Sequence, residues 1–200
     1  MAAEAGVQRF IFISSIGVNG NETWGQAFTA NTPPNPHSPY ATSKFEAERG
    51  LFQLSYQTGL EIVVIRPPLI TGPNPKGNLA TLKKIIDKGI PLPFSLATKN
   101  GRDLVSLGTL ISLIKTCIDH PNASGEVFLV SDGKAVSTRD IIEDFAHRAD
   151  LKLLLFPFPL SLLSMGLKVL GRHNMSSQLF GDLEIDISDT KHKLGWKPKE

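Results

Sequence analysis

Three short apolar runs along the chain are typical of strands buried on both faces. The first run is Arg9 to Ser14 (R-F-I-F-I-S), the second is Glu61 to Arg66 (E-I-V-V-I-R), and the third is Val127 to Val130. Nearly continuous apolar runs of this length occur in parallel sheets whose two faces are both covered. The pattern therefore predicts three buried strands.

Apolar residues recur at helical spacing between these runs. The longest pattern begins at Ser38-Pro39, an N-cap followed by proline at the first helical position, and ends at Gly59. Because strands alternate with helices, the sequence predicts an α/β fold with a parallel sheet. The other helical patterns are Leu79 to Lys88, Leu107 to Asp119, and Ser137 to Ala149, the last with a capping-box start.

The segment 17–38 shows no hydrophobic period and is predicted to be a long loop. Loops of this length in compact domains are usually functional or disordered. Its turn-forming residues are Gly17, Gly20, Pro33, Pro34 and Pro36.

Composition narrows the class of protein. With 200 residues and 41% hydrophobic content, the chain can bury a core without a disulfide or a metal. Cys117 has no partner for a disulfide, and the five histidines lack any metal-ligand spacing, so no metal site is predicted. The net charge of +2 comes from scattered residues, which argues against a nucleic-acid partner. We predict a cytoplasmic protein that binds a small molecule.

The uncharged stretch Leu153 to Leu167 is too short for the roughly 20 residues of a membrane span. Pro157 and Pro159 interrupt it, and Lys152 and Lys168 flank it. The first residues are neither basic nor followed by a long apolar run, so no signal peptide is predicted. The sequence therefore predicts neither a membrane span nor export.

Candidate proton-transfer residues surround the start of the predicted helix 39–58. Tyr40 and Lys44 are four residues apart, so their side chains share one helix face. A neighbouring ammonium favours the phenolate form of a tyrosine and makes it a usable acid and base. Ser15, at the carboxyl end of the preceding strand, is placed to hold the reacting oxygen, because ligands bind at that edge of such sheets. The alternative is an ordinary surface pair.

Five motifs occur in a fixed order and together resemble the extended short-chain dehydrogenases/reductases. The set is similar to the NAD-dependent epimerase/dehydratase family, including its UDP-glucose 4-epimerase and UDP-N-acetylquinovosamine dehydrogenase groups. The resemblance covers nearly the whole chain. The motifs are F-I-F-I-S-S-I-G-V-N-G, P-Y-A-T-S-K-F-E-A-E, I-R-P-P-L-I-T-G-P, G-R-D-L-V-S-L and L-G-W-K-P.

The resemblance implies roles for particular residues, with NAD or NADP as cofactor and a nucleotide sugar as substrate. It implies that Ser15, Tyr40 and Lys44 are catalytic. The implied cofactor-binding residues are Ser14, Tyr40, Lys44, Pro67, Pro68 and Leu69, and the implied substrate-binding residues are Ser15, Asn78, Leu79, Leu92, Phe94 and Arg102. For Arg102 the alternative is a solvated loop charge, and for Phe94 it is an ordinary core position.

The sequence departs from the family pattern in two places. The family begins with a strand, G-x-x-G-x-x-G and a helix, about 100 residues before the catalytic serine. Here only 14 residues precede Ser15, and Gly17-Val-Asn-Gly20 leads into a proline-bearing loop, not a helix. A second phosphate-binding arginine is also missing where Ser176 stands, and Arg172 is the nearest substitute.

These departures predict an incomplete Rossmann-like sheet that lacks its N-terminal βαβ units. Residues 1–75 are expected to be the carboxyl-terminal half of an NAD(P)-binding domain with the catalytic residues. Residues 76–200 are expected to be mainly a small nucleotide-sugar lobe, with one strand near 127–130 returning to the sheet. Strands 9–14 and 61–66 are expected to lose sheet neighbours and expose an edge.

The leading hypothesis is oxidation or reduction at C4 of a UDP-hexose with NAD(P) by an enzyme of which this chain is a truncated part. Epimerase, dehydrogenase, reductase and dehydratase outcomes all stay open, as does a homodimer. Two alternatives remain: an inactive remnant that binds a nucleotide sugar without turnover, and a reductase of a steroid or phenolic substrate.

Overall fold

The computed structural model describes residues 3–72, 78–171 and 173–199, and within them helices separate most of the strands. The α/β fold class predicted from the sequence is confirmed. The strands are β1 (Arg9–Ile13), β2 (Glu61–Arg66), β3 (Leu69–Thr71), β4 (Leu104–Ser106) and β5 (Val127–Leu129). The helices are α1 (Pro39–Thr58), α2 (Asn78–Asp87), α3 (Leu107–Asp119), α4 (Thr138–Arg148), α5 (Leu160–Val169), α6 (His173–Phe180) and α7 (Ser188–Leu194), with short 3-10 helices η1 (Ile16–Val18) and η2 (Pro121–Ala123).

The main sheet has three parallel strands in the order β1-β2-β5. Ile11 pairs with Val63, and Val64 pairs with Val127, so β2 lies between its two neighbours. The expectation that 61–66 would expose an edge is therefore wrong, because the backbone of β5 satisfies that side of β2. In this sheet β1 is an edge strand.

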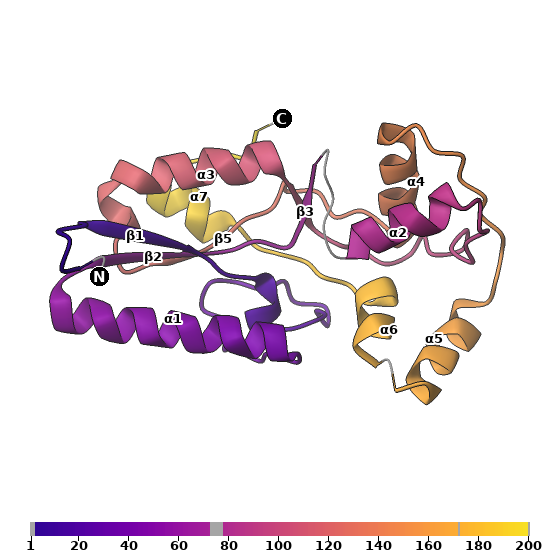
Figure 1. Ribbon diagram of the computed structural model, residues 1–200, viewed down its shortest axis with the longest axis horizontal. Coiled ribbons are helices and arrows are strands. Elements are labelled where there is room, and N and C mark those ends of the chain that lie inside the picture. Colours follow the sequence, from indigo (N-terminus) through magenta and orange to yellow (C-terminus); the bar gives the residue numbers. More distant parts are fainter. Residues whose placement is uncertain (1–2, 73–77, 172, 200) are drawn as a thin grey trace.

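Alternate residues of β2 face opposite helices, as the two-residue period of a strand requires. Ile62 and Val64 pack with Phe52 of α1, whereas Val63 and Ile65 belong to the core that includes Leu113 of α3. Figure 1 shows α1 on one side of the sheet and α3 on the other. The near-continuous apolar run of β2 is thus explained by burial of both faces.

The ends of α1 follow the local signals in the sequence. The Ser38 hydroxyl accepts a hydrogen bond from the Ala41 amide at 3.1 Å, and Pro39 occupies the first helical position. Gly59 ends the helix with φ at 75°, a left-handed conformation that glycine adopts without steric cost. The helix therefore starts where the sequence predicts, which fixes the position of Tyr40.

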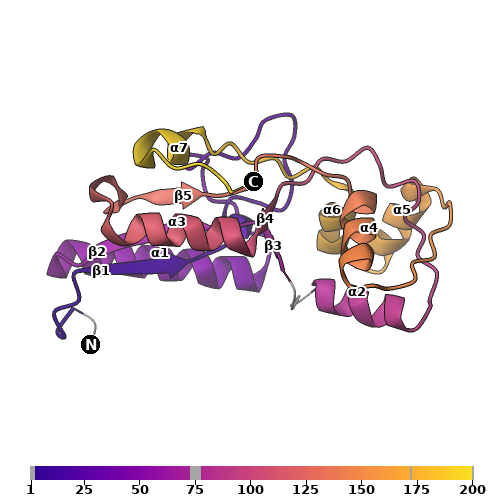
Figure 2. The ribbon, with the colours of Figure 1, turned by 90° about the horizontal axis from the view of Figure 1, so that it is seen from above.

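A second sheet pairs β3 with β4 in parallel, and neither strand is predicted from the sequence. β3 begins at Leu69, directly after Pro67-Pro68, and has only three residues. Segments this short carry no readable period, so their pairing depends on contacts made in the folded chain. This small sheet carries the chain away from the main sheet toward the helical lobe (Figure 2).

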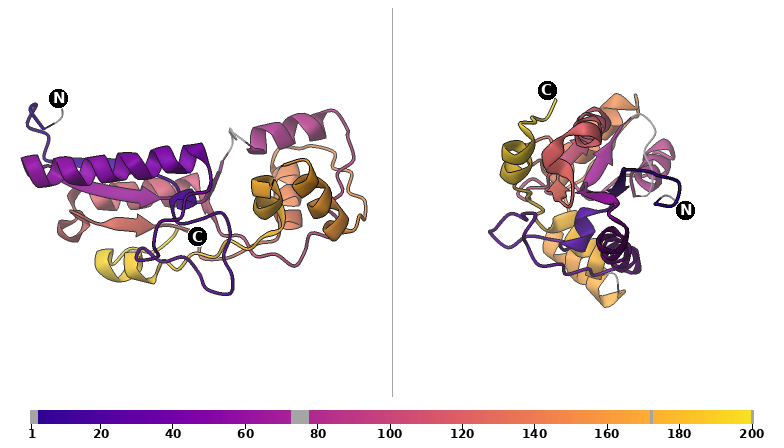
Figure 3. Two further views of the ribbon diagram at one scale, coloured as in Figure 1. Left: turned by 90° about the horizontal axis from the view of Figure 1, so that it is seen from below. Right: turned by 90° about the vertical axis from the view of Figure 1, so that its left-hand side faces the viewer.

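Helices α2, α4, α5 and α6 gather at the end of the molecule away from the N-terminus (Figure 3). Ile86, Leu92, Ile142 and Ala146 form a small core in this lobe. Residues after position 75 also enter the main core, and the predicted division at 75/76 stays a prediction. Examples in the main core are Val105, Leu113, Phe128 and Leu194. Among the described residues, no helix is both long enough and apolar enough to cross a bilayer.

Candidate active site

The carboxyl ends of β1 and β2 are joined by backbone hydrogen bonds. The Ser14 amide donates to the Ile65 carbonyl at 2.7 Å, and the Ile16 amide donates to the Pro67 carbonyl at 2.9 Å. Ser15 lies between these two bonds and caps η1, where its Oγ accepts from the Gly17 amide at 3.1 Å. The hydroxyl of Ser15 is thereby held at the edge of the sheet where ligands of such folds bind.

Gly17 allows this serine turn to pack closely against α1. A Cβ atom placed on Gly17 would lie 3.3 Å from Ser15 Oγ and 3.4 Å from the Cβ of Ala41. The first separation is tighter than an ordinary contact and lies within the turn, whereas the second is an ordinary van der Waals distance between the turn and the helix. Ala41 directly follows Tyr40, so the packing places the Ser15 turn beside the first turn of α1.

Lys44 connects the same helix turn to β1. Its Nζ donates to the Ile13 carbonyl at 2.9 Å and lies 4.6 Å from the ring centroid of Phe12. The distance from Nζ to the ring centroid of Tyr40 is 5.8 Å, within cation–π range. An ammonium has three N–H donors, so two others remain beside the Ile13 bond. The Tyr40 side chain is 61% exposed and accessible to a ligand.

The other cofactor-binding residues implied by the family resemblance lie next to this group. Ser14 is 4% exposed, and its Oγ has no hydrogen-bond partner in the part of the chain that the structure describes. Pro67 and Pro68 are buried, whereas Leu69 is 38% exposed. An unpartnered buried hydroxyl is costly unless a bound group satisfies it. The residues therefore fit a bound cofactor that accepts or donates a hydrogen bond at Ser14.

A buried charged network beneath the site was not anticipated from the sequence. Arg66 donates to both carboxylate oxygens of Glu48, at 2.9 Å and 2.6 Å, and to Asn19 Oδ1 at 3.0 Å. The side-chain Nδ2 of Asn19 in turn donates to the backbone carbonyls of Thr29 and Thr32. This network ties the end of β2 to α1 and to the loop after Ser15. The sequence feature that could have indicated a buried charge is Glu48, which lies in line with the apolar positions of its helix.

Arg102 lies at the boundary between the sheet and the lobe. Its Nη1 donates to the carbonyls of Gly181 at 2.8 Å and Ser177 at 3.3 Å. Burial lowers the pKa of Arg102 to about 10, while the carboxylates of Asp182 and Glu22 oppose that shift. The guanidinium is therefore charged at neutral pH. It is a partly buried group that hydrogen-bonds to two backbone carbonyls, which differs from the alternative of a solvated loop charge.

The remaining predicted substrate residues lie in the lobe. Leu92 is 6% exposed within the lobe core, and Phe94 is partly buried with its ring 6.2 Å from that of Phe180. Helix α2 begins at Asn78, but the side chains of Asn78 and Leu79, like residue Arg172, lie outside the described residues. Leu92 and Phe94 thus pack within the lobe core, which is a cluster separate from the group formed by Ser15, Tyr40 and Lys44.

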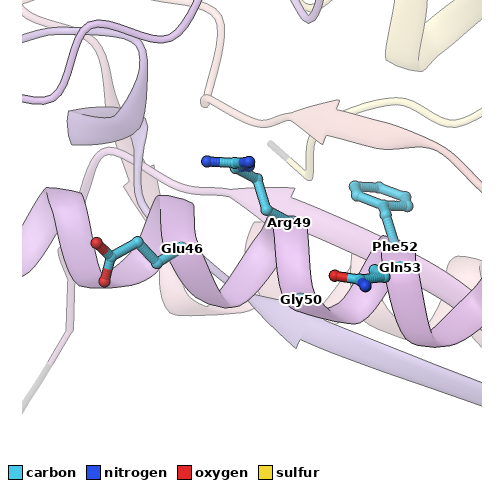
Figure 4. Close-up of a pocket in the computed structure, with 5 residues that line it drawn as sticks. All are labelled: Glu46, Arg49, Gly50, Phe52 and Gln53. Atoms are coloured by element: carbon cyan, nitrogen blue, oxygen red, sulfur yellow. The ribbon is translucent and has the colours of Figure 1, made fainter.

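A shallow depression follows the surface of α1 and contains none of the predicted site residues. Figure 4 shows the residues that line it along this helix. No group of three or more potential metal ligands occurs among the described residues. The lining residues are Glu46, Arg49, Gly50, Phe52 and Gln53.

Comparisons with known proteins identify relatives of the whole chain. A model of the NAD dependent epimerase/dehydratase family matches residues 1–131. UDP-glucose 4-epimerase of Vibrio cholerae is 44% identical over 200 residues, which cover 100% of this chain and 61% of that protein.

Solved structures show the same fold. The structure of UDP-glucose 4-epimerase of Thermus thermophilus in complex with NAD matches with a TM-score of 0.72 at 23% identity. The match covers 99% of this chain and 61% of the Thermus thermophilus chain. UDP-glucose 4-epimerase of Thermotoga maritima with UDP-glucose has a TM-score of 0.71 at 20% identity, with 99% of this chain and 60% of its own covered.

The parallel sheet with a serine turn and a Tyr–Lys helix at its carboxyl edge defines a Rossmann-like α/β protein. The chain belongs to the NAD-dependent epimerase/dehydratase family, as the family model and the Vibrio cholerae relative show. The resemblance inferred from the motifs is confirmed. The chain spans about three fifths of the length of the relatives it matches.

Proposed function

We propose that the protein interconverts the hydroxyl and keto forms at C4 of a UDP-linked hexose, using NAD or NADP. The observation that carries the proposal is that the Ser15 turn lies beside the helix of Tyr40 and Lys44, with Lys44 bonded to the Ile13 carbonyl at the end of β1. The Vibrio cholerae relative is named a UDP-glucose 4-epimerase, which supports this choice of substrate. The Thermus thermophilus structure is named as a complex with NAD, which supports the cofactor.

The residues have distinct tasks in the proposed reaction, and Lys44 has two. Bound NAD(P) would supply the exchange of hydride with the sugar carbon. As the carbonyl forms, the phenolate oxygen of Tyr40 takes the proton of the sugar hydroxyl, and it returns that proton when the carbonyl is reduced. The Lys44 ammonium stabilises the phenolate, and Ser15 Oγ holds the reacting oxygen by a hydrogen bond. Ser14, Lys44 and Pro67 to Leu69 would hold the cofactor.

The fate of the keto sugar decides the net reaction. If the keto sugar rotates within the site before it is reduced again, the product is the C4 epimer. If the keto sugar leaves the site, the reaction is a dehydrogenation. The name of the Vibrio cholerae relative favours epimerisation. We also place the reaction in the cytoplasm, because the free thiol of Cys117 suits a reducing compartment.

The nucleotide part of the substrate is assigned to the boundary with the lobe. Arg102 is the proposed diphosphate ligand, because a guanidinium suits phosphate oxygens. Its Nη1 already binds two carbonyls, so the phosphate would be met by the other guanidinium nitrogens. Phe94 is the proposed contact for the base, and Leu92 supports it from the lobe core. Asn78 and Leu79 keep the substrate roles implied by the family resemblance.

The two tyrosines of the chain give a matched test, because both lie on α1. In an enzyme restored to the length of its relatives with a glycine-rich cofactor segment, Tyr40→Phe removes the proposed acid and base, so turnover of UDP-glucose with added NAD should fall by about 100-fold or more. Tyr56→Phe changes a side chain that is 94% exposed and should leave turnover unchanged. Product formation can be followed by NMR of the sugar anomeric protons.

Equal and measurable turnover by the restored enzyme with and without Tyr40→Phe would contradict the assignment of Tyr40. Isothermal titration with UDP and with NAD distinguishes an enzyme from an inactive remnant that only binds a nucleotide sugar. UDP binding by a wild-type chain that neither binds NAD nor turns over substrate would support a nucleotide-sugar-binding remnant instead of an enzyme.

A further inference from the structure

Helix α5 departs from the pattern of a surface helix in a globular protein. Such a helix normally presents polar residues to solvent and one apolar stripe to the core. No residue of α5 is buried, yet its sequence L-S-L-L-S-M-G-L-K-V is apolar around most of its circumference. The helix therefore has an apolar outward face that no described part of the chain covers.

The inward and outward faces of α5 can be separated by helical spacing. Leu160, Leu163 and Leu167 are partly buried, and Ser164 Oγ lies 2.7 Å from Ser176 Oγ of α6. That face packs toward the lobe. The outward stripe consists of Leu162 (51% exposed), Met165 (58%) and Val169 (81%), at i, i+3 and i+7.

Exposed apolar residues also occur in the sequence before and after the helix. Leu170, which follows α5, is 74% exposed, and Leu154 and Phe156, which precede it, are 56% and 40% exposed. In Figure 1 this segment and α5 occupy the outer side of the lobe, at the opposite end of the molecule from the N-terminus. We call these six residues the α5 surface: Leu154, Phe156, Leu162, Met165, Val169 and Leu170. An exposed apolar surface of this kind marks an interaction site.

Charge indicates which partner the α5 surface fits. Residues 151–181 contain Lys152, Lys168 and Arg172 but no aspartate or glutamate. Lys152 and Lys168 are both exposed. Exposed apolar residues flanked by lysines, with no acidic residue, suit the interface of an anionic membrane, because apolar side chains can enter the headgroup region while the lysines contact lipid phosphates. A second copy seated on α5 by two-fold symmetry would bring Lys168 toward its own equivalent, with no carboxylate of this segment to pair with.

We propose that the α5 surface docks the protein reversibly onto an anionic phospholipid bilayer. The apolar stripe of α5 would enter the headgroup region, and Lys152 and Lys168 would contact lipid phosphates. The helix lies on the membrane and does not cross it, in agreement with its length of 10 residues. This inference is independent of the proposed chemistry at Tyr40.

Cosedimentation of the purified chain with lipid vesicles tests the proposal. The wild-type chain should pellet with vesicles of phosphatidylcholine and phosphatidylglycerol and stay mostly soluble with phosphatidylcholine alone. Met165→Ser/Val169→Ser should lower the partition coefficient by about tenfold, because it removes the centre of the apolar stripe. Lys168→Glu should lower it by at least about fivefold, and raised salt should have a similar effect.

A matched control uses exposed aromatic residues outside the α5 surface. Trp24→Ser/Tyr56→Ser changes residues that are 83% and 94% exposed and should leave vesicle binding unchanged. Circular dichroism should show that all variants are folded. Failure of the wild type to pellet with anionic vesicles, or undiminished binding of Met165→Ser/Val169→Ser, would overturn the proposal. A dimer in light scattering that this variant abolishes, without vesicle binding by the wild type, would assign the surface to a second copy instead.

Discussion

Arg66 and Glu48 carry opposite charges on side chains that are only 6% and 3% exposed. Burying charges is costly, and their mutual attraction offsets the cost only when the geometry is good and the other polar atoms are bonded. Here the guanidinium makes two bonds to the carboxylate and a third to Asn19. Because Asn19 follows η1, the pair stabilises the loop that leads away from Ser15.

Removing one partner of this pair should destabilise the fold strongly. Glu48→Leu leaves a buried, unpaired guanidinium, so the free energy of unfolding should fall by about 3–5 kcal/mol in urea titrations. The double variant Glu48→Leu/Arg66→Met should lose less than the sum of the two single variants. Asp87→Asn, in the exposed pair with Lys83, is the control and should cost less than about 1 kcal/mol. A Glu48→Leu chain as stable as the wild type would contradict this view.

At the scale of elements, α4 owes its start to a capping box. The Ser137 hydroxyl accepts from the Asp140 amide, and the Asp140 carboxylate accepts from the Ser137 amide at 3.0 Å and from its hydroxyl at 2.7 Å. These hydrogen bonds from Ser137 lower the pKa of Asp140, since they favour the charged carboxylate. The cap therefore couples the stability of α4 to pH.

The sign of that coupling follows from the lowered pKa. Because the folded chain holds the Asp140 proton less tightly than the unfolded chain, the stabilisation is present above about pH 4 and is lost as pH falls through the folded pKa. At pH 7, Asp140→Ala should lower the free energy of unfolding by about 1 kcal/mol, and the difference from wild type should shrink at pH 3. Urea titrations at both pH values check this. A difference that is equal at both would show that the carboxylate charge is not involved.

Elements with strong local signals could be predicted, whereas those that depend on distant partners could not. α1 and α4 begin at the predicted caps, and β2 has the predicted bounds. β3 and β4 have three residues each, and their pairing joins Leu69 to Leu104 across 35 positions of the chain. Within the candidate site, the proximity of Tyr40 and Lys44 could be predicted from their spacing on one helix. The bond from Arg66 to Asn19 spans 47 positions, so no local pattern could reveal it.

At the scale of the whole molecule, residues 101–103 join the sheet to the lobe. The amide of Arg102 donates to the Val136 carbonyl, and the amide of Asp103 donates to the Leu183 carbonyl, both at 2.8 Å. Three segments of the chain therefore meet here. The Asp103 carboxylate accepts from the Ile185 amide at 2.7 Å, and burial is the main cause that raises its pKa. A substrate held by Arg102 would be positioned by the same backbone contacts that join the two parts.

Arg102 should consequently affect stability even without a ligand. Arg102→Met removes the donors to the Gly181 and Ser177 carbonyls and leaves Asp182 and Glu22 without their neighbouring charge. The free energy of unfolding should fall by about 1.5–3 kcal/mol in urea titrations of the ligand-free chain. Arg148→Met, in an exposed helical pair with Asp144, should cost less than about 1 kcal/mol. If Arg102→Met weakens UDP binding but leaves the unfolding midpoint unchanged, the only role of Arg102 is in ligand binding. If the midpoint falls as well, Arg102 both joins the two parts of the molecule and forms the boundary at which we place the diphosphate.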